Sequence, residues 1–175
     1  GSPQERRKFL NIMISQLRPL YMFVLNEYIK TMNQRNSYLK QIKFENKPEE
    51  MLDIWDMKLA EYGMKIYSYR KEFIEKISNK IQEIHSKITN NNEIIEIKYN
   101  FECKDKNEYY SKLVKQRRTD IQKGSTSFGI HRDDFCVFIN NNLISSYGSQ
   151  GQHRTAILSL KISELQIIFD EVGEY

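Results

Sequence analysis

Residues 52–88 read LDIWDMKLAEYGMKIYSYRKEFIEKISNKIQEIHSKI and carry the most regular apolar pattern of the chain. The apolar residues of this stretch recur at spacings of three and four, which is the pattern of a helix that packs one face against a partner helix. They are Leu52, Trp55, Leu59, Tyr62, Ile66, Tyr69, Phe73, Ile77, Ile81, Ile84 and Ile88. Pro48-Glu49-Glu50 suits the start of this helix, because acidic side chains favour the positive end of the helix dipole. Asn90-Asn91-Asn92 is expected to end it.

A second apolar stripe precedes the first and predicts a partner helix. It consists of Leu17, Tyr21, Val24, Tyr28, Met32, Leu39 and Ile42. Pro19 suits the first turn of such a helix, and a break follows at residues 44–48. Two helical stripes joined by a short break predict an antiparallel helical hairpin. Arg35 interrupts the stripe. We favour a snorkelling side chain there, and the alternative is an ion pair that fixes the register of the hairpin or a group that faces DNA.

The second half of the chain changes its period and predicts a mixture of strands and helices. We expect strands at residues 94–99 and 135–139, a turn at 140–142 with 143–144 returning as a hairpin partner, and helices at 107–123 and 149–170. Helices followed by mixed elements indicate an α+β fold rather than a doubly wound sheet. The predicted domains are an entry segment at 1–18, whose Gly1-Ser2 resembles the scar of an expression tag, a coiled-coil-like hairpin at 19–90, and an α+β segment at 91–175.

The composition of the chain restricts its possible functions only loosely. The chain has 175 residues and a net charge of +4, from 27 basic and 23 acidic residues, which permits nucleic-acid binding without arguing for it. Cys103 and Cys136 lie too far apart for a CxxC motif, so we expect free thiols in a reducing cytoplasm. The apolar runs are too short to span a bilayer, and no membrane association is expected.

Two runs carry the chemistry: GSTSFGIHRDD at residues 124–134 and YGSQGQHRT at residues 147–155. Ser149 precedes a predicted helix, so its hydroxyl can cap that helix or donate to an anion. Gly151 lets a ligand approach the backbone, and the free amides of a first helical turn, together with the helix dipole, form a phosphate site. For the four residues SQGQ alone, the simpler interpretation is an ordinary N-cap.

The two runs together resemble the RecF family, whose members have an ABC-type ATPase head related to that of SMC proteins. The resemblance extends to the runs at 6–10, 34–36, 55–56 and 59–60 and so covers nearly the whole chain. The sequence departs from the family pattern at Ile130, His153 and Asn142 without affecting a proposed contact. The expected architecture is therefore a long antiparallel hairpin attached to part of an ABC-ATPase head.

The resemblance implies a role in recombinational repair. Ser149, Gly151 and Gln152 match the ABC signature motif, which in this family closes over the γ-phosphate of ATP held by a second subunit. Such proteins bind ATP and Mg²⁺ and dimerise on ATP. They associate with single-stranded and double-stranded DNA and with gap junctions, and they help RecO and RecR to load recombinase in repair, replication restart and the SOS response.

The chain lacks other parts of such an enzyme. It contains no GxxxxGK[ST] loop to cradle phosphates, and it stops at Tyr175, where the family would continue into a strand that ends in aspartates. We therefore expect no catalytic residue, bound cofactor or ATPase activity in this fragment, whereas the full-length parent would be a weak DNA-dependent ATPase. The alternative function is a non-enzymatic helical hairpin that docks a partner protein or DNA.

Two further groups of residues have less specific patterns. His131, Arg132, Asp133 and Asp134 form a family motif, and its acidic pair is expected to brace the turn before a strand rather than to bind a metal, because adjacent residues of a strand face opposite sides. Lys115, Arg117, Arg118 and Lys123 form a basic cluster. Such a cluster is usually a solvated face, and in a repair protein it is a candidate for phosphate contacts with DNA.

Overall fold

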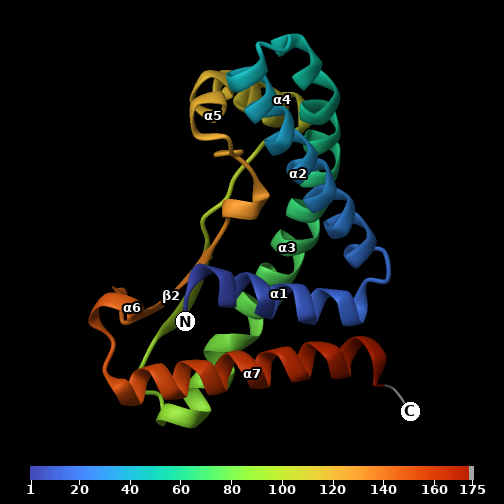
Figure 1. The fold of residues 1–175 in the computed structure, drawn as a ribbon. Coiled ribbons are helices and arrows are strands. Elements are labelled where there is room, and N and C mark those ends of the chain that lie inside the picture. Colours follow the sequence, from blue (N-terminus) through green and yellow to red (C-terminus); the bar gives the residue numbers. More distant parts are fainter. Residues whose placement is uncertain (174–175) are drawn as a thin grey trace. The chain divides into compact units, whose positions relative to one another are not determined.

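The structure is a computed structural model that describes residues 1–173 (Figure 1). The last two residues of the predicted segment 91–175 lie outside the described residues. The elements in chain order are α1 (Pro3–Leu17), α2 (Tyr21–Glu45), η1 (Glu49–Met51), α3 (Leu52–Thr89), β1 (Ile95–Tyr99), α4 (Lys106–Lys115), α5 (Arg117–Lys123), η2 (Ile130–Arg132), β2 (Phe135–Ile139), β3 (Asn142–Leu143), α6 (Ile144–Tyr147) and α7 (Gln150–Val172). Long helices with one antiparallel sheet confirm the α+β prediction.

The described chain forms two compact units. The first, called here the sheet unit, comprises residues 1–18, 70–100 and 134–173. The second, called the hairpin unit, comprises residues 19–69 and 101–133. The two units share α3 and divide it after Tyr69. The domain boundaries expected from the sequence, at residues 18 and 90, stay a prediction.

The hairpin unit contains the predicted pair of antiparallel helices. Along α2 and α3, Tyr21 packs edge-on against Tyr69 at 5.5 Å and Tyr38 packs against Trp55 at 4.9 Å between ring centroids. The partner's number falls along α3 as the residue number rises along α2, so the helices run in opposite directions. Tyr21, Tyr28 and Leu39 from the first stripe are each at most 1% exposed. The hairpin prediction is confirmed.

Arg35 corrects the favoured prediction of a snorkelling side chain. The residue is 0% exposed, and its guanidinium donates from Nε to Asp56 Oδ1 at 2.6 Å and from Nη1 to Asp120 Oδ2 at 2.7 Å. The snorkelling interpretation is wrong because α5 supplies a carboxylate that lies 85 positions away in the sequence. The alternative interpretation, an ion pair within the hairpin, is the one observed.

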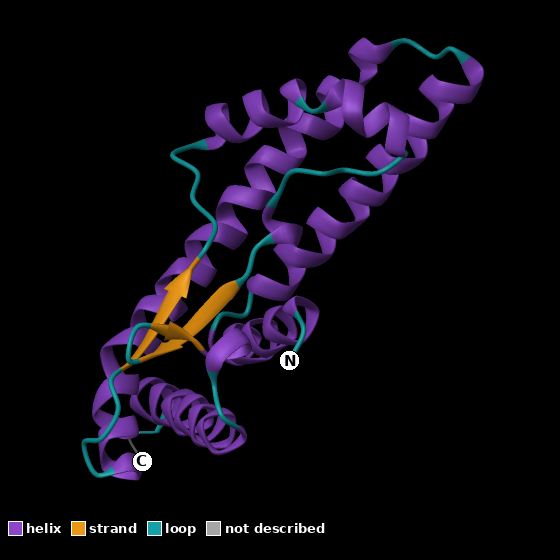
Figure 2. Ribbon diagram, turned by 90° about the vertical axis from the view of Figure 1, so that its left-hand side faces the viewer, coloured by secondary structure: helices purple, strands orange, loops and turns teal. Residues whose placement is uncertain are grey.

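The sheet unit is built on β1 and β2, which pair antiparallel from Ile95 opposite Ile139 to Tyr99 opposite Phe135 (Figure 2). Alternate residues of both strands are buried, so one face of the sheet covers the core. Asn140 and Asn141 have φ of 51° and 68° and form the two-residue turn into β3. Asparagine tolerates this left-handed backbone, which a tight hairpin requires.

Helix α1 is the main element that the sequence analysis did not predict, since residues 1–18 were expected to be an entry segment. Ser2 caps it, because the Ser2 hydroxyl accepts from the Glu5 amide while the Glu5 carboxylate accepts from the Ser2 amide. Leu10, Met13 and Ile14 are each at most 1% exposed. Figure 1 shows α1 beside α7, and Arg18 at its end forms an ion pair with Glu171 at 2.7 Å.

The bounds of the other helices and strands differ less from those predicted from the sequence. The helix predicted at 107–123 is divided at Gln116 into α4 and α5, and Ile144 begins α6 instead of extending the returning strand. Strand β1, strand β2 and helix α7 lie within two residues of their predicted bounds. Both cysteines are free thiols as predicted, and burial raises the pKa of the Cys103 thiol to about 11. Among residues 1–173 no helix is both long and apolar enough to cross a membrane.

Candidate functional site

The SQGQ run forms the N-terminal turn of α7. Ser149 is the N-cap, and its Oγ accepts from the Gln152 amide at 3.1 Å. In return, Gln152 Oε1 accepts from the Ser149 amide at 2.9 Å, which completes a capping box. The first four backbone amides of a helix have no acceptor within the helix. The capping box satisfies two of them, those of Ser149 and Gln152. The amides of Gln150 and Gly151 are thus suited to an anion that approaches the turn.

Gly151 leaves the turn open. The residue is exposed, and a Cβ added to it would meet nothing nearer than Ser149 Oγ at 4.0 Å. Packing within the protein therefore does not demand a glycine here. A glycine instead lets another molecule approach the backbone closely, which is what phosphate recognition by amides requires.

A polar chain behind the turn holds the Gln152 side chain in place. Gln152 Nε2 donates to Glu93 Oε2 at 3.0 Å, and His85 Nε2 lies 2.8 Å from Glu93 Oε1. Neither His85 nor Glu93 belongs to a motif that the sequence reveals. His85 follows Ile81 by four residues and so belongs to the buried face of α3. This spacing is the sequence feature from which its burial could have been predicted.

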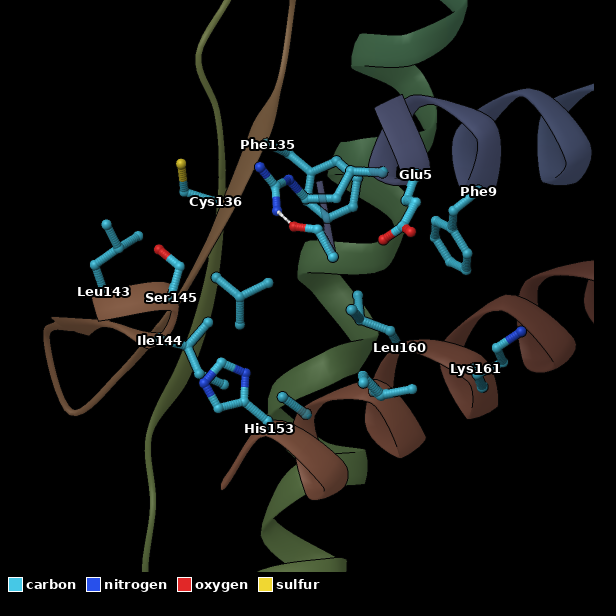
Figure 3. Close-up of a pocket in the computed structure, with 15 residues that line it drawn as sticks. Glu5, Phe9, Phe135, Cys136, Leu143, Ile144, Ser145, His153, Leu160 and Lys161 are labelled. Atoms are coloured by element: carbon cyan, nitrogen blue, oxygen red, sulfur yellow. Dashed lines mark hydrogen bonds between the residues drawn. The ribbon is translucent and has the colours of Figure 1, made fainter. Parts of the chain in front are cut away.

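A mainly apolar cavity of about 400 Å³ lies in the same unit (Figure 3). Figure 3 shows Phe9 of α1, Phe135 of β2, Ile144 of α6 and Leu160 of α7 around it. His153 also lines this cavity, whereas Ser149, Gly151 and Gln152 do not. The cavity and the exposed SQGQ turn are therefore different features of the sheet unit.

In the hairpin unit, His131 uses both of its ring nitrogens. Nδ1 lies 2.9 Å from the hydroxyl of Tyr28, and Nε2 lies 2.8 Å from the carbonyl oxygen of Thr126. The Tyr109 hydroxyl lies 2.6 Å from that of Tyr28, and burial, followed by the proximity of Tyr28, raises the pKa of Tyr109 well above its usual value. These contacts occupy the ring nitrogens that a metal would need.

Gly129 precedes this motif in a backbone conformation that only glycine adopts easily. Its φ is 149°, and a Cβ there would overlap the Tyr28 hydroxyl. Of the other motif residues in this unit, Arg132 is exposed and Asp133 is buried. Among the described residues, no group of three or more histidine, cysteine or acidic side chains is arranged to hold a metal ion.

Asp134 belongs to the sheet unit and lies immediately before β2. Its carboxylate accepts from Arg6 Nε at 2.6 Å, from Arg6 Nη2 at 2.8 Å and from the Phe135 amide at 2.8 Å. Burial raises the pKa of Asp134, but the hydrogen bonds and charge of Arg6 outweigh it, and the pKa lies below its usual value. These contacts fit the role of a residue that braces the turn before the strand.

The predicted basic cluster contains one arginine with internal partners. Arg117 binds Asp56 at 2.9 Å through Nε and Asp53 at 2.5 Å through Nη2. Lys115, Arg118 and Lys123 are exposed and form no ion pair with another described residue. Three of the four predicted positions are therefore accessible to a phosphate.

Three of the short sequence runs that resemble the RecF family contact one another inside the hairpin unit. Besides its two aspartates, Arg35 binds the Thr126 hydroxyl at 3.0 Å, and that hydroxyl donates to Asn36 at 2.7 Å. The Trp55 indole donates to Gln34 at 3.3 Å. The runs at residues 34–36, 55–56 and 124–126 thus form one network of polar contacts, which the sequence alone did not bring together.

Comparisons with known proteins agree on one family, although no family model matches the chain. A protein of Exiguobacterium sp. named DNA replication and repair protein RecF is 41% identical over 184 residues, covering 100% of this chain and 50% of its own length. The protein of the same name from Clostridium novyi is 43% identical over 178 residues, covering 99% of this chain and 48% of its own length. The chain thus spans about half the length of these relatives.

Solved structures agree with the relatives. A structure described as the recombination mediator protein RecF-ATPrS in the RecFOR pathway matches with a TM-score of 0.92 and 41% identity, covering 99% of this chain and 49% of that one. The corresponding RecF-ATP structure matches with the same TM-score and 40% identity. The order of motifs, the fold and these similarities lead to one conclusion: the chain belongs to the RecF family of DNA replication and repair proteins.

Proposed function

We propose that the chain is part of a RecF-like DNA-repair ATPase. In this proposal Ser149, Gly151 and Gln152 contact the γ-phosphate of ATP held by a second copy of the full-length protein. The observation that carries it is the exposed first turn of α7, where a capping box fixes the backbone and an unobstructed glycine leaves amides accessible. The structural relatives named RecF-ATP and RecF-ATPrS support ATP as the ligand.

The proposed contact links ATP to assembly. A helix N-terminus attracts the terminal phosphate, so ATP bound to one copy stabilises its contact with the α7 turn of the other. Loss of that phosphate on hydrolysis removes the attraction and weakens the dimer. No GxxxxGK[ST] loop occurs in the sequence, so other parts of the full-length protein would hold the α- and β-phosphates and Mg²⁺.

A substitution at Ser149 tests this function. In the full-length protein, Ser149→Arg removes the cap and places a long side chain over the turn. We expect ATP to bind each monomer with wild-type affinity but to stop driving dimerisation, as measured by sedimentation with and without ATP. The proposal would be contradicted if the variant dimerised at the same concentrations of ATP and protein as the wild type.

We further propose that the full-length protein binds DNA, works with RecO and RecR, and acts in the cytoplasm. The single-stranded and double-stranded substrates, the gap junctions and the roles in replication restart and the SOS response belong to the same proposal. Support for it comes from the relatives' name and from the RecFOR pathway to which the structural relative belongs. Lys115, Arg118 and Lys123 are the proposed DNA contacts, because they are exposed cations.

The chain by itself is proposed to be inactive. It would supply only the turn that acts on another copy, since the sequence has no phosphate-cradling loop. We expect the purified chain to hydrolyse ATP no faster than a mock purification from cells without it. Turnover above that background that follows the chain through gel filtration would overturn this proposal.

The alternative, a non-enzymatic module that docks a partner, is favoured by one observation in the hairpin unit. Large apolar side chains near the turn between α2 and α3 are exposed, including Phe44 at 75%, Met57 at 64% and Ile54 at 48%. Exposed apolar clusters commonly mark binding sites. Titrating the chain with RecO or RecR by calorimetry, with Phe44→Ser as the matched variant, tests this function. The two functions are compatible within one protein.

A further inference from the structure

The SQGQ turn has a buried support that its motif does not include. We propose that His85 and Glu93 are positioning residues for this turn, and that through them the end of α3 sets the geometry of the phosphate-contacting amides. This inference rests on the proposed function and deepens it. It assigns a role to two residues that lie outside the motif, in α3 and in the segment after it.

The contacts form a continuous chain within the sheet unit. The Glu93 carboxylate uses both of its oxygens, accepting from Gln152 Nε2 at 3.0 Å on Oε2 and meeting His85 Nε2 at 2.8 Å on Oε1. His85 Nδ1 then lies 2.7 Å from the hydroxyl of Ser159, two turns further along α7. The side chain of His85 is 0% exposed and that of Glu93 is 17% exposed. A buried polar chain therefore ends at an exposed turn.

Glu93 fixes the orientation of the side-chain amide of Gln152. The oxygen of this group accepts hydrogen bonds and its nitrogen donates them, and the capping box needs the oxygen to point to the backbone amide of Ser149. A carboxylate cannot donate, so Glu93 selects the orientation in which the Gln152 nitrogen faces it. The reversed amide would place two donors against each other at Ser149 and two acceptors against each other at Glu93. The carboxylate thus favours the one arrangement that keeps the turn closed.

His85 in turn fixes Glu93. Its Nε2 faces a carboxylate oxygen and therefore carries a proton, while its Nδ1 holds the Ser159 hydroxyl of α7. Ser159 is 0% exposed, so this contact anchors the imidazole to the buried side of the helix whose first turn Glu93 supports. A buried ring with a partner on each nitrogen has one orientation available. The geometry of the turn consequently depends on where the last turns of α3 place His85.

An ordinary N-cap does not require this support. A serine and the residue three positions later satisfy each other's amides without a third side chain. The additional carboxylate and imidazole are buried polar groups, which are costly unless they are fully hydrogen-bonded. Preorganised donors are most effective where they meet a charged ligand, because no free energy is then spent on reorienting them during binding.

The test uses the full-length protein and the variant Glu93→Ala. We expect ATP-dependent dimerisation to weaken about tenfold to one-hundredfold, the range for losing a hydrogen bond to a charged group. Nucleotide affinity of the monomer is expected to stay at the wild-type value. The melting temperature is expected to fall, because the buried His85 loses its partner, so dimerisation is measured well below that temperature, where the variant is folded and positioning is separated from general stability. Glu96→Ala is the matched control, since Glu96 is an exposed residue of β1 three positions away. Glu93→Gln keeps only one of the two acceptor oxygens and is expected to recover part of the dimerisation.

The outcomes distinguish this inference from the function on which it rests. If Ser149→Arg abolishes dimerisation on ATP while Glu93→Ala dimerises like the wild type, the positioning role is wrong and the proposed function stands. If Ser149→Arg has no effect, the proposed function itself is wrong. Should Glu93→Ala fail to fold, Glu93→Asp decides, because its shorter carboxylate cannot meet His85 and Gln152 together. Wild-type dimerisation by a folded Glu93→Asp protein would overturn the inference.

Discussion

Arg35 connects three helices of the hairpin unit. It is 0% exposed and binds carboxylates of Asp56 in α3 and of Asp120 in α5. Both aspartates are 0% exposed as well. A buried ion pair contributes little net free energy compared with a well-packed apolar core, but removing one partner leaves a charge buried without compensation. The network therefore specifies how α2, α3 and α5 fit together.

Replacing Arg35 by Met is expected to lower the free energy of unfolding by about 3 to 5 kcal/mol, because Asp120 loses its cation while it remains buried. Arg35→Lys is expected to recover only part of this loss, since one ammonium group cannot reproduce the guanidinium fork. Urea denaturation of the chain measures both changes. Arg118→Ala, at an exposed arginine, is the control and is expected to stay within about 0.5 kcal/mol of the wild type. Equal stabilities for Arg35→Met and Arg118→Ala would contradict this account.

Single residues could be predicted where a motif or a cap determines them. Ser149 and Gly151 were identified from the sequence because a hydroxyl and a glycine at a helix start have a known use. The partners of Arg35 and Gln152 could not be identified, since Asp120 and Glu93 lie 85 and 59 positions away and belong to no pattern. Contacts of this kind depend on tertiary packing, which a local sequence pattern does not contain.

At the scale of elements, α1 and α7 are joined at their ends by charge. Arg18 Nη1 lies 2.7 Å from Glu171 Oε2, and Lys76 of α3 lies 3.0 Å from Glu171 Oε1. The hydrogen bond from Arg18, with Lys76 adding to it, holds the pKa of Glu171 below its usual value. A carboxylate with a lowered folded-state pKa contributes stability above its unfolded pKa of about 4.3. That contribution is lost as the pH falls through the folded-state pKa.

The sheet unit is therefore expected to become less stable on acidification below about pH 4.3, partly through Glu171. Glu171→Gln is expected to flatten this part of the dependence, because the amide has no charge to lose. Urea denaturation at a series of pH values between neutral and acid measures the slope. Glu83→Gln, at an exposed residue of α3, is the matched control. A slope that is unchanged in Glu171→Gln would contradict the role given to this ion pair.

The turn between β2 and β3 supports a second prediction at this scale. Asn141 has φ of 68°, which a β-branched side chain adopts only with strain. Asn141→Val is expected to lower the free energy of unfolding by about 1 to 3 kcal/mol, whereas Asn141→Gly is expected to be close to neutral. Thermal unfolding of the two variants side by side measures the difference. A valine variant as stable as the glycine variant would show that the turn is not held in this conformation.

Helices and strands could be predicted where their apolar pattern continues over many residues. The stripe of α3 continues over eleven apolar positions, and β1 and β2 have alternating burial between turn residues. Helix α1 has a shorter stripe, but Ser2, Pro3 and Glu5 formed a helix start that the assignment of an entry segment obscured. The break at Gln116 had no such signal, because neither glycine nor proline marks it.

At the scale of the whole molecule, DNA binding is expected to depend on Lys115, Arg118 and Lys123. Reversing all three to Glu in the full-length protein is expected to weaken DNA binding most at low salt. The slope of log affinity against log salt concentration is expected to fall by about 0.9 for each DNA phosphate that the protein no longer neutralises. Fluorescence anisotropy with single-stranded and double-stranded oligonucleotides measures both quantities. An unchanged slope would show that DNA binds to other residues, and Lys58→Glu at an exposed position of α3 is the control.

In the proposed function the Ser149 turn acts on ATP bound to another copy, and mixing two variants of the full-length protein distinguishes this arrangement from one within a single copy. One variant carries Ser149→Arg, and the other has an intact turn but cannot bind ATP. We expect that neither variant dimerises by itself when ATP is added and that an equimolar mixture with ATP forms heterodimers, detected by sedimentation of differently labelled chains. Heterodimers that fail to form, or a Ser149→Arg protein that dimerises alone on ATP, would contradict it.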